Sequence, residues 1–142
     1  EWEYAARAGQ DTEYAGADKA EDVGWYMGSG YKTKAEWIAN GAFFKTREVG
    51  LKQPNAWGLY DMTGNVSEMV WDRYQNFIRS SRNKPLGQSF TDPVGHPTRS
   101  RRVVRGGSFS DPIDGVRITV RKSFSPSQGS LSTGFRLVRT IQ

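Results

Sequence analysis

The sequence predicts an α+β fold with a small antiparallel sheet and long irregular loops. Three observations favour this class: one clear helical pattern at the N-terminus, short runs of alternating apolar and polar residues near the C-terminus, and 16 Gly among 142 residues. Gly usually makes up about 7% of a chain, so much of this one is turn and loop. Short strands with few helices fit one small sheet better than repeated strand–helix units. At this length we expect a single domain, residues 1–142.

Residues 1–8 are predicted to form a helix. Trp2, Ala5 and Ala6 follow helical spacing among good helix formers, and Gly9 stands where helices commonly end. We expect this helix to begin at or before the first residue.

The central part of the chain is predicted to be mostly turn and loop. Residues 10–41 are polar and rich in Gly but contain Trp and Tyr, so these loops should pack onto a core. A tight turn is expected at 53–58, where Pro-Asn and Gly flank Trp57. Residues 62–71 form an apolar run that fits a strand or a helix equally well. Residues 74–102, with several Pro and Gly, form the longest predicted loop.

Three short strands are predicted in the C-terminal part of the chain. The first covers 101–105 and ends at a Gly-Gly pair. In residues 116–121 apolar and polar side chains alternate, which is typical of a half-buried strand. The third strand, 135–139, follows Gly134.

The composition excludes several classes of protein and site. Aromatic residues make up 13% of the chain, unlike a disordered chain, and no apolar run is long enough to predict a transmembrane segment. There is no Cys and a single His, His96. The chain therefore has no disulfide or thiolate metal site, and it is poorly supplied for a zinc site or a histidine-based triad.

The net charge of +5 is unevenly distributed. Residues 1–71 carry 7 Lys and Arg against 11 Asp and Glu, whereas residues 72–142 carry 13 against 4. The simplest interpretation is that two oppositely charged parts of one domain lie against each other. The basic residues of 99–105 would also suit phosphate contacts, but they alternate with Val as in a strand with one charged face. We therefore expect no nucleic-acid partner.

Four sequence blocks occur in order along the chain. They are Glu1-Trp-Glu-Tyr-Ala-Ala-Arg-Ala-Gly9, the block 49–68 with Gly-Leu-Tyr-Asp-Met-Thr-Gly-Asn-Val-Ser-Glu68 at its end, Arg102-Val-Val-Arg-Gly-Gly-Ser108 and Gly134-Phe-Arg-Leu-Val-Arg139. Together they resemble the formylglycine-generating-enzyme/sulfatase-modifying-factor family, whose fold is a variant of the C-type lectin fold. The resemblance implies that sheet-opening strands precede residues 1–9. We therefore expect this chain to be the C-terminal portion of a longer domain, with the missing N-terminal part of the same polypeptide as a partner.

The oxidase chemistry of this family is not expected here. The resemblance implies copper held by two cysteines shortly after the Gly-Gly-Ser block, and soft thiolates suit Cu(I). That stretch, 109–116, contains no Cys, so neither copper nor cysteine-dependent formylglycine formation is expected. The similar sulfoxide synthases need an iron-binding His cluster, which one His cannot supply. Asp111 and Asp114 could still converge as an acid–base pair, although Asp beside Pro or Gly is common in turns. An enzyme or enzyme accessory with non-cysteine chemistry is therefore the alternative function.

Residues 108–134 have a restricted composition. Apart from Arg117, Arg121, Lys122 and Gln128, they are all Ser, Phe, Asp, Pro, Ile, Gly, Val, Thr or Leu. This segment resembles the variable region of a diversity-generating retroelement target protein, in which adenine-directed mutagenesis rewrites codons near the 3′ end of the gene. The resemblance implies a non-catalytic receptor for a protein or glycan, at the cell surface or outside the cell. A Ser- and Gly-rich loop in an invariant lectin-type protein is the other interpretation.

A rigid sheet with variable loops predicts which side chains contact the ligand. They are the residues of 108–134 expected to point away from the sheet: Phe109, Ser110, Asp111, Ile113, Asp114, Thr119, Phe124, Ser125 and Ser127. The two Phe would be apolar anchors among adaptable polar residues, unless they pack in the core. Arg117 and Arg121 are expected to tie strands to the acidic part of the chain.

The resemblance also implies a calcium site in the second block. Its ligands would be Asp61, Gly64, Val66 and Glu68, through a side-chain carboxylate and main-chain oxygens. Ca²⁺ requires such hard oxygen donors. Met69 stands where the family usually has Trp. The alternative is that Glu68 caps or forms a salt bridge locally without an ion.

Overall fold

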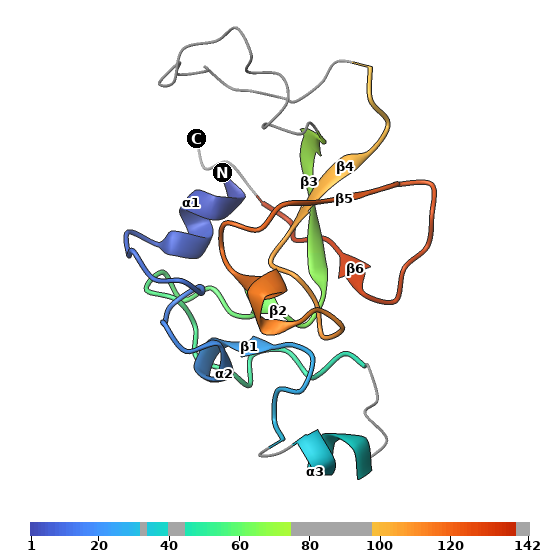
Figure 1. The fold of residues 1–142 in the computed structure, drawn as a ribbon. Helices are drawn as coiled ribbons and strands as arrows, with labels where there is room; N and C mark the ends of the chain where they lie inside the picture. The colour runs from blue at the N-terminus through green and yellow to red at the C-terminus, as the bar shows by residue number, and fades with distance from the viewer. Residues whose placement is uncertain (32–33, 40–44, 75–97, 139–142) are drawn as a thin grey trace, which may run out of the picture.

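The computed structural model describes residues 1–31, 34–39, 45–74 and 98–138 and has the predicted α+β architecture (Figure 1). The elements are α1 (Trp2–Arg7), α2 (Ala20–Val23), β1 (Gly24–Trp25), α3 (Lys34–Ala39), β2 (Thr63–Gly64), β3 (Ser67–Arg73), β4 (Arg102–Arg105), the 3₁₀ helix η1 (Ile113–Val116), β5 (Lys122–Phe124) and β6 (Thr133–Gly134). No helix within these residues is both long and apolar enough to cross a membrane.

The main sheet has the strand order β5-β4-β3-β6. Strand β4 pairs antiparallel with both β3 and β5, but β6 runs parallel to β3. Strands β5 and β6 therefore lie at opposite edges of the sheet (Figure 1). A separate parallel pair joins β1 to β2. The predicted sheet is thus small but mixed, because a long connection carries the chain from β5 across to the far edge.

The predicted N-terminal helix is confirmed. Helix α1 starts at Trp2, not at or before Glu1 as expected, and ends at Arg7; the C-cap residue Ala8 has φ 47° and Gly9 follows with φ 80°. The apolar run 62–71 is divided between β2 and β3 by a turn at Gly64 and Asn65, with φ of 74° and 60°. A Cβ on Gly64 would lie 2.0 Å from the Trp25 carbonyl oxygen, so the approach of β1 to β2 requires Gly here.

The strand predicted at 116–121 is wrong. Val116 ends η1, and a turn follows it. Val116 and Ile118 are buried, as their alternation suggested, but each enters a different hydrophobic cluster. The backbone of 118–120 is held by the Arg105 side chain of β4 rather than by a neighbouring strand, as described below.

The strand predicted at 135–139 is also misplaced. The strand in this region is β6, which ends at Gly134. In the described tail 135–138, Arg136 makes hydrogen bonds inside the fold, while Phe135, Leu137 and Val138 are exposed. This reverses the usual arrangement, in which alternate apolar residues are buried. Arg139 lies outside the described residues, as does most of the predicted loop 74–102.

The two oppositely charged parts of the sequence do lie against each other. Three Arg of the basic part each contact a Glu of the acidic part at 2.5 Å: Arg105–Glu3, Arg117–Glu13 and Arg136–Glu68. These pairs connect α1, the following loop and β3 with the C-terminal segments. The predicted role of Arg117 in tying the two parts together is therefore confirmed.

Candidate ligand-binding surface

The predicted variable segment, 108–134, starts at a tight turn after β4. Gly106 and Gly107 have φ of 80° and 66°. A Cβ on Gly107 would lie 2.6 Å from the Gly115 carbonyl oxygen, so this turn lets η1 pack closely behind it. From there the segment alternates between buried and exposed stretches until it reaches β6.

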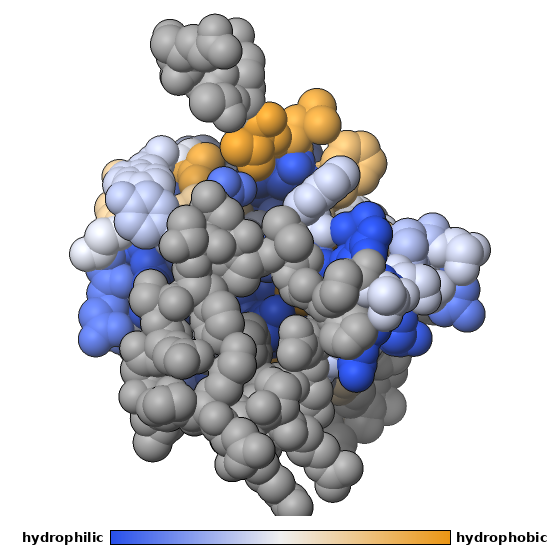
Figure 2. Space-filling model, turned by 90° about the horizontal axis from the view of Figure 1, so that it is seen from above, coloured by the Kyte–Doolittle hydropathy of each residue, from blue (hydrophilic) through white to orange (hydrophobic). Residues whose placement is uncertain are grey.

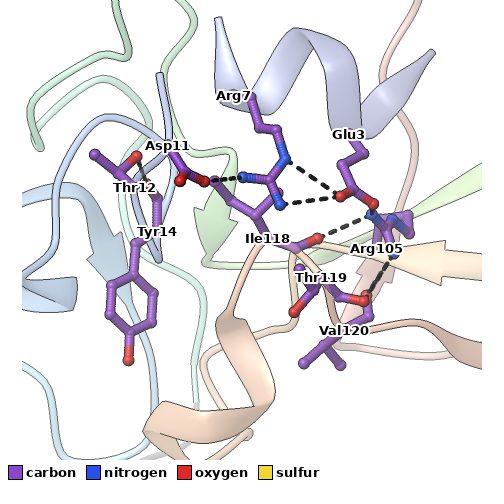
Figure 3. Close-up of polar contacts among 9 residues, drawn as sticks. All are labelled: Glu3, Arg7, Asp11, Thr12, Tyr14, Arg105, Ile118, Thr119 and Val120. Atoms are coloured by element: carbon purple, nitrogen blue, oxygen red, sulfur yellow. Dashed lines mark hydrogen bonds and ion pairs between the residues drawn. The ribbon is translucent and has the colours of Figure 1, made fainter. Parts of the chain in front are cut away.

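The buried side chain of Arg105, on β4, binds the main chain in the middle of the segment. Its side chain is 4% exposed and its guanidinium lies 5.2 Å from the centre of the Trp2 ring. It donates hydrogen bonds to the carbonyl oxygens of Ile118 at 2.9 Å, Val120 at 3.0 Å and Thr119 at 3.3 Å (Figure 3). A planar fork of donors is suited to such a cluster of acceptors. All three acceptors are main-chain atoms.

The charge of Arg105 is balanced from α1. Glu3 lies 2.5 Å from Arg105 and also pairs with Arg7 at 3.2 Å (Figure 3). Burial lowers the pKa of the Arg105 guanidinium, and the charge of Glu3 opposes that shift. The group stays protonated because an arginine pKa begins so high. Helix α1 therefore supports the segment through Arg105.

Several other contacts between the segment and the rest of the chain also use main-chain atoms of the segment, whereas Arg117–Glu13 and Arg101–Ser123 Oγ use its side chains. The amide of Phe109 donates to the Asn65 carbonyl, and the amide of Ile118 to the Glu13 carbonyl. Three carbonyl oxygens of the segment also accept hydrogen bonds. The Met27 amide donates to Asp111, the Arg101 guanidinium to Ser123 and the Ser67 amide to Ser132. These bonds are 2.8–3.1 Å long. We call these main-chain contacts and the three hydrogen bonds from Arg105 the main-chain anchors. They do not depend on which side chains the segment carries.

Two acidic residues of the segment are held by cations. Asp111 accepts from the Ser108 amide at 2.9 Å and hydroxyl at 3.0 Å, and pairs with Lys122. Asp114 pairs with Arg117 at 2.5 Å. Each carboxylate has its own cation, so the two do not form the shared acid–base pair that was considered. Asp111 instead shapes the loop after β4.

The predicted contact residues differ in exposure. Ile113, Asp114, Thr119 and Ser127 are exposed, whereas Ser110, Asp111, Phe124 and Ser125 are half-buried. Phe109 is only 9% exposed, and its own amide is bonded to Asn65. Its prediction as an exposed anchor is therefore wrong, because its side chain is buried in the fold. Phe124 lies on the edge strand β5 and retains an accessible side.

An exposed arm, residues 126–131, connects β5 to β6, and Ser127 is the one predicted contact residue in it. Every residue in it is exposed, and Leu131 is 92% exposed. Hydroxyl pairs Ser125–Ser127 at 2.9 Å and Ser130–Ser132 at 3.1 Å lie at its two ends. The sequence feature that could have indicated this exposed arm is a single Leu between two Ser residues in a loop that contains Pro and Gly. The Leu131 side chain is therefore accessible to another molecule.

Comparison with known proteins identifies the family. The profile of the sulfatase-modifying factor enzyme 1-like domain matches residues 1–141. The chain belongs to the formylglycine-generating enzyme/sulfatase-modifying factor family. This confirms the resemblance read from the four sequence blocks.

Individual relatives show what share of their own length this chain covers. The chaperone protein LppX of Paenibacillus barcinonensis is 28% identical over 99% of this chain and 47% of its own length. The formylglycine-generating enzyme of Streptomyces coelicolor is 30% identical over 96% of this chain and 43% of its own length. The solved structure of Treponema denticola variable protein 1 has a TM-score of 0.74 and 32% identity, covering 95% of this chain and 43% of that one. The likeness to a variable protein and the C-type-lectin-type fold are thereby confirmed, and the chain spans about half the length of its curated relatives.

The calcium ligands that the resemblance implies, Asp61, Gly64, Val66 and Glu68, stay a prediction, and two of their side chains already have partners in the protein. Both carboxylate oxygens of Glu68 are engaged: Arg136 Nη2 lies 2.5 Å from one, and Trp2 Nε1 donates to the other at 2.7 Å. Asp61 accepts from the Gly50 amide at 2.8 Å. The other carboxylate oxygen of Asp61, Oδ1, is buried and has no hydrogen-bond partner among the described residues. Arg136 already supplies the positive charge beside Glu68, which forms a local salt bridge.

Proposed function

We propose that this chain is the non-catalytic, ligand-binding part of a variable protein that binds another protein through exposed side chains of 108–134. One observation carries the proposal: the main-chain anchors hold this segment while its exposed side chains take no part in them. Side chains can then be exchanged without changing the path of the backbone. Such a surface suits a receptor whose specificity is varied on a constant fold.

The comparisons support this proposal at a coarser level. Treponema denticola variable protein 1 has the same fold over nearly the whole chain. The family also includes formylglycine-generating enzymes, but the present sequence has no Cys with which to perform cysteine-dependent chemistry. Asp111 and Asp114, the residues on which non-cysteine catalysis would depend, are each paired with a cation. These features favour binding over catalysis.

The contact surface in this proposal combines predicted residues with the exposed arm. Its members are Ile113, Asp114, Thr119, Phe124, Ser125, Ser127 and Leu131. Its exposed apolar side chains, Ile113 and Leu131, would anchor a ligand, and its small hydroxyl residues would adapt to that ligand. A glycan is the second ligand class, and the protein is proposed to act at the cell surface or outside the cell.

Nucleic acid is a poorer candidate for the ligand. Arg101 donates to Ser123, Arg102 to the Trp71 carbonyl, and Arg105 is buried. Guanidinium groups committed in this way have little left to offer a phosphate backbone. The basic strand β4 therefore supports the sheet rather than a nucleic-acid site.

Genome context and natural variation test the proposal. We expect a template repeat beside the gene that matches its 3′ end except at adenines, and isolates whose substitutions cluster at exposed positions of 108–134. Residues outside 108–134 that hold the segment, such as Arg105 and Asn65, should stay constant. A complete genome without such a repeat and without a reverse transcriptase would contradict the proposal, as would substitutions spread evenly along the chain.

A paired library selection tests binding directly. One library of the full-length protein randomises Ile113, Thr119, Ser127 and Leu131; the control library randomises the buried pair Val116 and Ile118. Both are displayed, challenged with protease and selected on immobilised lysozyme as a defined protein target. We expect the first library to stay protease-resistant and to yield binders, and the control library to lose resistance. Equal loss in both would show that the exposed positions are not interchangeable.

A further inference from the structure

One face of the main sheet, on the side away from α1, carries aromatic and basic side chains. Arg105 of β4 and Glu68 of β3 are paired across the two strands, and both contact α1, so their side chains point toward that helix. Side chains alternate between the two faces along a strand. Arg102 therefore points away from α1, and the residues paired with it in the sheet, Arg73 and Phe124, share its face.

Trp71, two residues before Arg73 on β3, lies on this face and is 77% exposed. The Arg102 guanidinium stacks over its ring, 5.1 Å from the ring centre, and also donates to the Trp71 carbonyl oxygen. These two contacts hold the ring from one side, while most of its surface stays accessible to solvent. An aromatic ring that is already held in place loses little conformational freedom when a ligand packs on it. Trp71 is therefore preorganised for contact with another molecule.

The charge around Trp71 is positive. None of the ion pairs between described residues includes Arg73 or Arg102, and none includes Arg99, which is exposed shortly before β4. Figure 2 shows strongly hydrophilic residues on the right of the molecule, the side on which the chain enters β4 in Figure 1. A partner that carries carboxylates would complement this charge.

This face continues into the proposed contact surface. Phe124, a member of that surface, is the residue of β5 that pairs with Arg102. Ser125 follows it and leads into the exposed arm 126–131. A ligand held by variable side chains at this edge of the sheet can therefore also reach Trp71. Trp and Arg are among the residue types on which the affinity of protein–protein interfaces most often depends.

We infer that Trp71, Arg73 and Arg102 form a constant subsite, called here the Trp71 subsite, that binds carboxylate-rich segments of a protein ligand. Arg102 positions the ring, the ring packs on the ligand, and Arg73 supplies the attracting charge. None of the three belongs to 108–134, so the subsite makes the same contacts whichever side chains the variable segment carries. The inference rests on the proposed function and deepens it, because it names the chemistry of the ligand.

Selection on a matched pair of protein targets tests the Trp71 subsite. The library of exposed positions described above is displayed on the full-length protein and selected on lysozyme, which is basic, and on α-lactalbumin, an acidic protein with the fold of lysozyme. We expect more binders on the acidic target. In several independent α-lactalbumin binders, Trp71→Ala should weaken the affinity at least about tenfold. Arg73→Glu should weaken it by a similar factor, because it places a negative charge opposite the carboxylates of the target.

Two control variants make matching changes elsewhere. Trp57→Ala removes another exposed Trp, and Lys45→Glu reverses an exposed charge outside the sheet. Both should leave the affinity for α-lactalbumin unchanged. Trp71→Ala should also leave the melting temperature of the full-length protein unchanged, because the side chain is 77% exposed. A lower melting temperature would show that Trp71 packs within the full-length protein, and it would overturn the inference.

The outcomes separate this inference from the proposed function. Binders that keep their affinity in Trp71→Ala and Arg73→Glu would overturn the inference alone, as would equal numbers of binders on the two targets. An absence of binders on both targets would contradict the proposed function and the inference with it. If Arg73→Glu abolishes binding of dextran sulfate or single-stranded DNA but leaves the protein binders unaffected, the surface belongs to another polyanion and the inference is also overturned.

Discussion

The guanidinium of Arg105 donates to the carbonyl oxygen of Ile118 at 2.9 Å from a position that is 4% exposed. This contact joins the constant strand β4 to the main chain of the segment proposed to vary. It explains how a stretch with no strand of its own between η1 and β5 keeps a defined path.

Replacing Arg105 should therefore destabilise the whole domain. Arg105→Met leaves three carbonyl oxygens without their donor, and we expect a loss of about 2–4 kcal/mol in the free energy of unfolding. Urea denaturation of the full-length protein measures it. Arg7→Met is the control, since Arg7 pairs with Glu3 at the surface and such pairs contribute about 1 kcal/mol or less. Equal effects of the two variants would show that the contacts to 118–120 are unimportant.

The two acidic residues of the segment should behave differently on truncation. Asp111→Ala removes the acceptor for the buried Ser108 amide and hydroxyl and the partner of Lys122, so a loss of about 1–3 kcal/mol is expected. Asp114→Ala removes one exposed ion pair and should cost about 1 kcal/mol or less. Thermal or urea unfolding compares them. A costly Asp114→Ala with a neutral Asp111→Ala would reverse the roles assigned to these residues.

Chelation should leave the stability of this domain unchanged. Because Glu68 is already neutralised by Arg136, we expect EDTA and added CaCl₂ to give the same melting temperature. Glu68→Gln, in contrast, breaks the ion pair with Arg136 and should lower the melting temperature in both conditions. A rise of several degrees with CaCl₂ that Glu68→Gln abolishes would establish a calcium site after all.

The contact between Tyr26 and Glu21 should make stability depend on pH at both extremes. The hydrogen bond from the Tyr26 hydroxyl lowers the pKa of Glu21, so its contribution is present at neutral pH and is lost as pH falls through the lowered value, below the ordinary 4.5. Burial, together with Glu21, raises the pKa of Tyr26. That contribution is therefore present below about pH 10 and is lost above it as pH rises toward the raised value.

Urea midpoints across the pH range check this prediction. Tyr26→Phe should lower the midpoint most at neutral pH and should flatten its decline at both ends. Tyr31→Phe, at a partly exposed tyrosine, serves as the control. Parallel pH profiles for the parent and Tyr26→Phe proteins would rule out this coupling.

Several features were predictable because they depend on local spacing or on total charge. Helix α1 follows from the spacing of Trp2, Ala5 and Ala6, and β4 from its two adjacent Val before a Gly-Gly pair. The contact between the acidic and basic parts of the chain followed from charge alone, although the particular pair Arg105–Glu3 did not. Helix α2 was missed, since four residues in a polar stretch contain too little periodicity.

By itself, then, the sequence determined the family, the fold class, the first helix and the position of the segment with restricted composition. Only the tertiary structure decided which side chains of that segment face solvent. Phe109 is buried at 9% exposure, whereas Leu131, in the same segment, is 92% exposed. Burial depends on what packs against a residue from distant parts of the chain, and a local pattern contains no record of that partner.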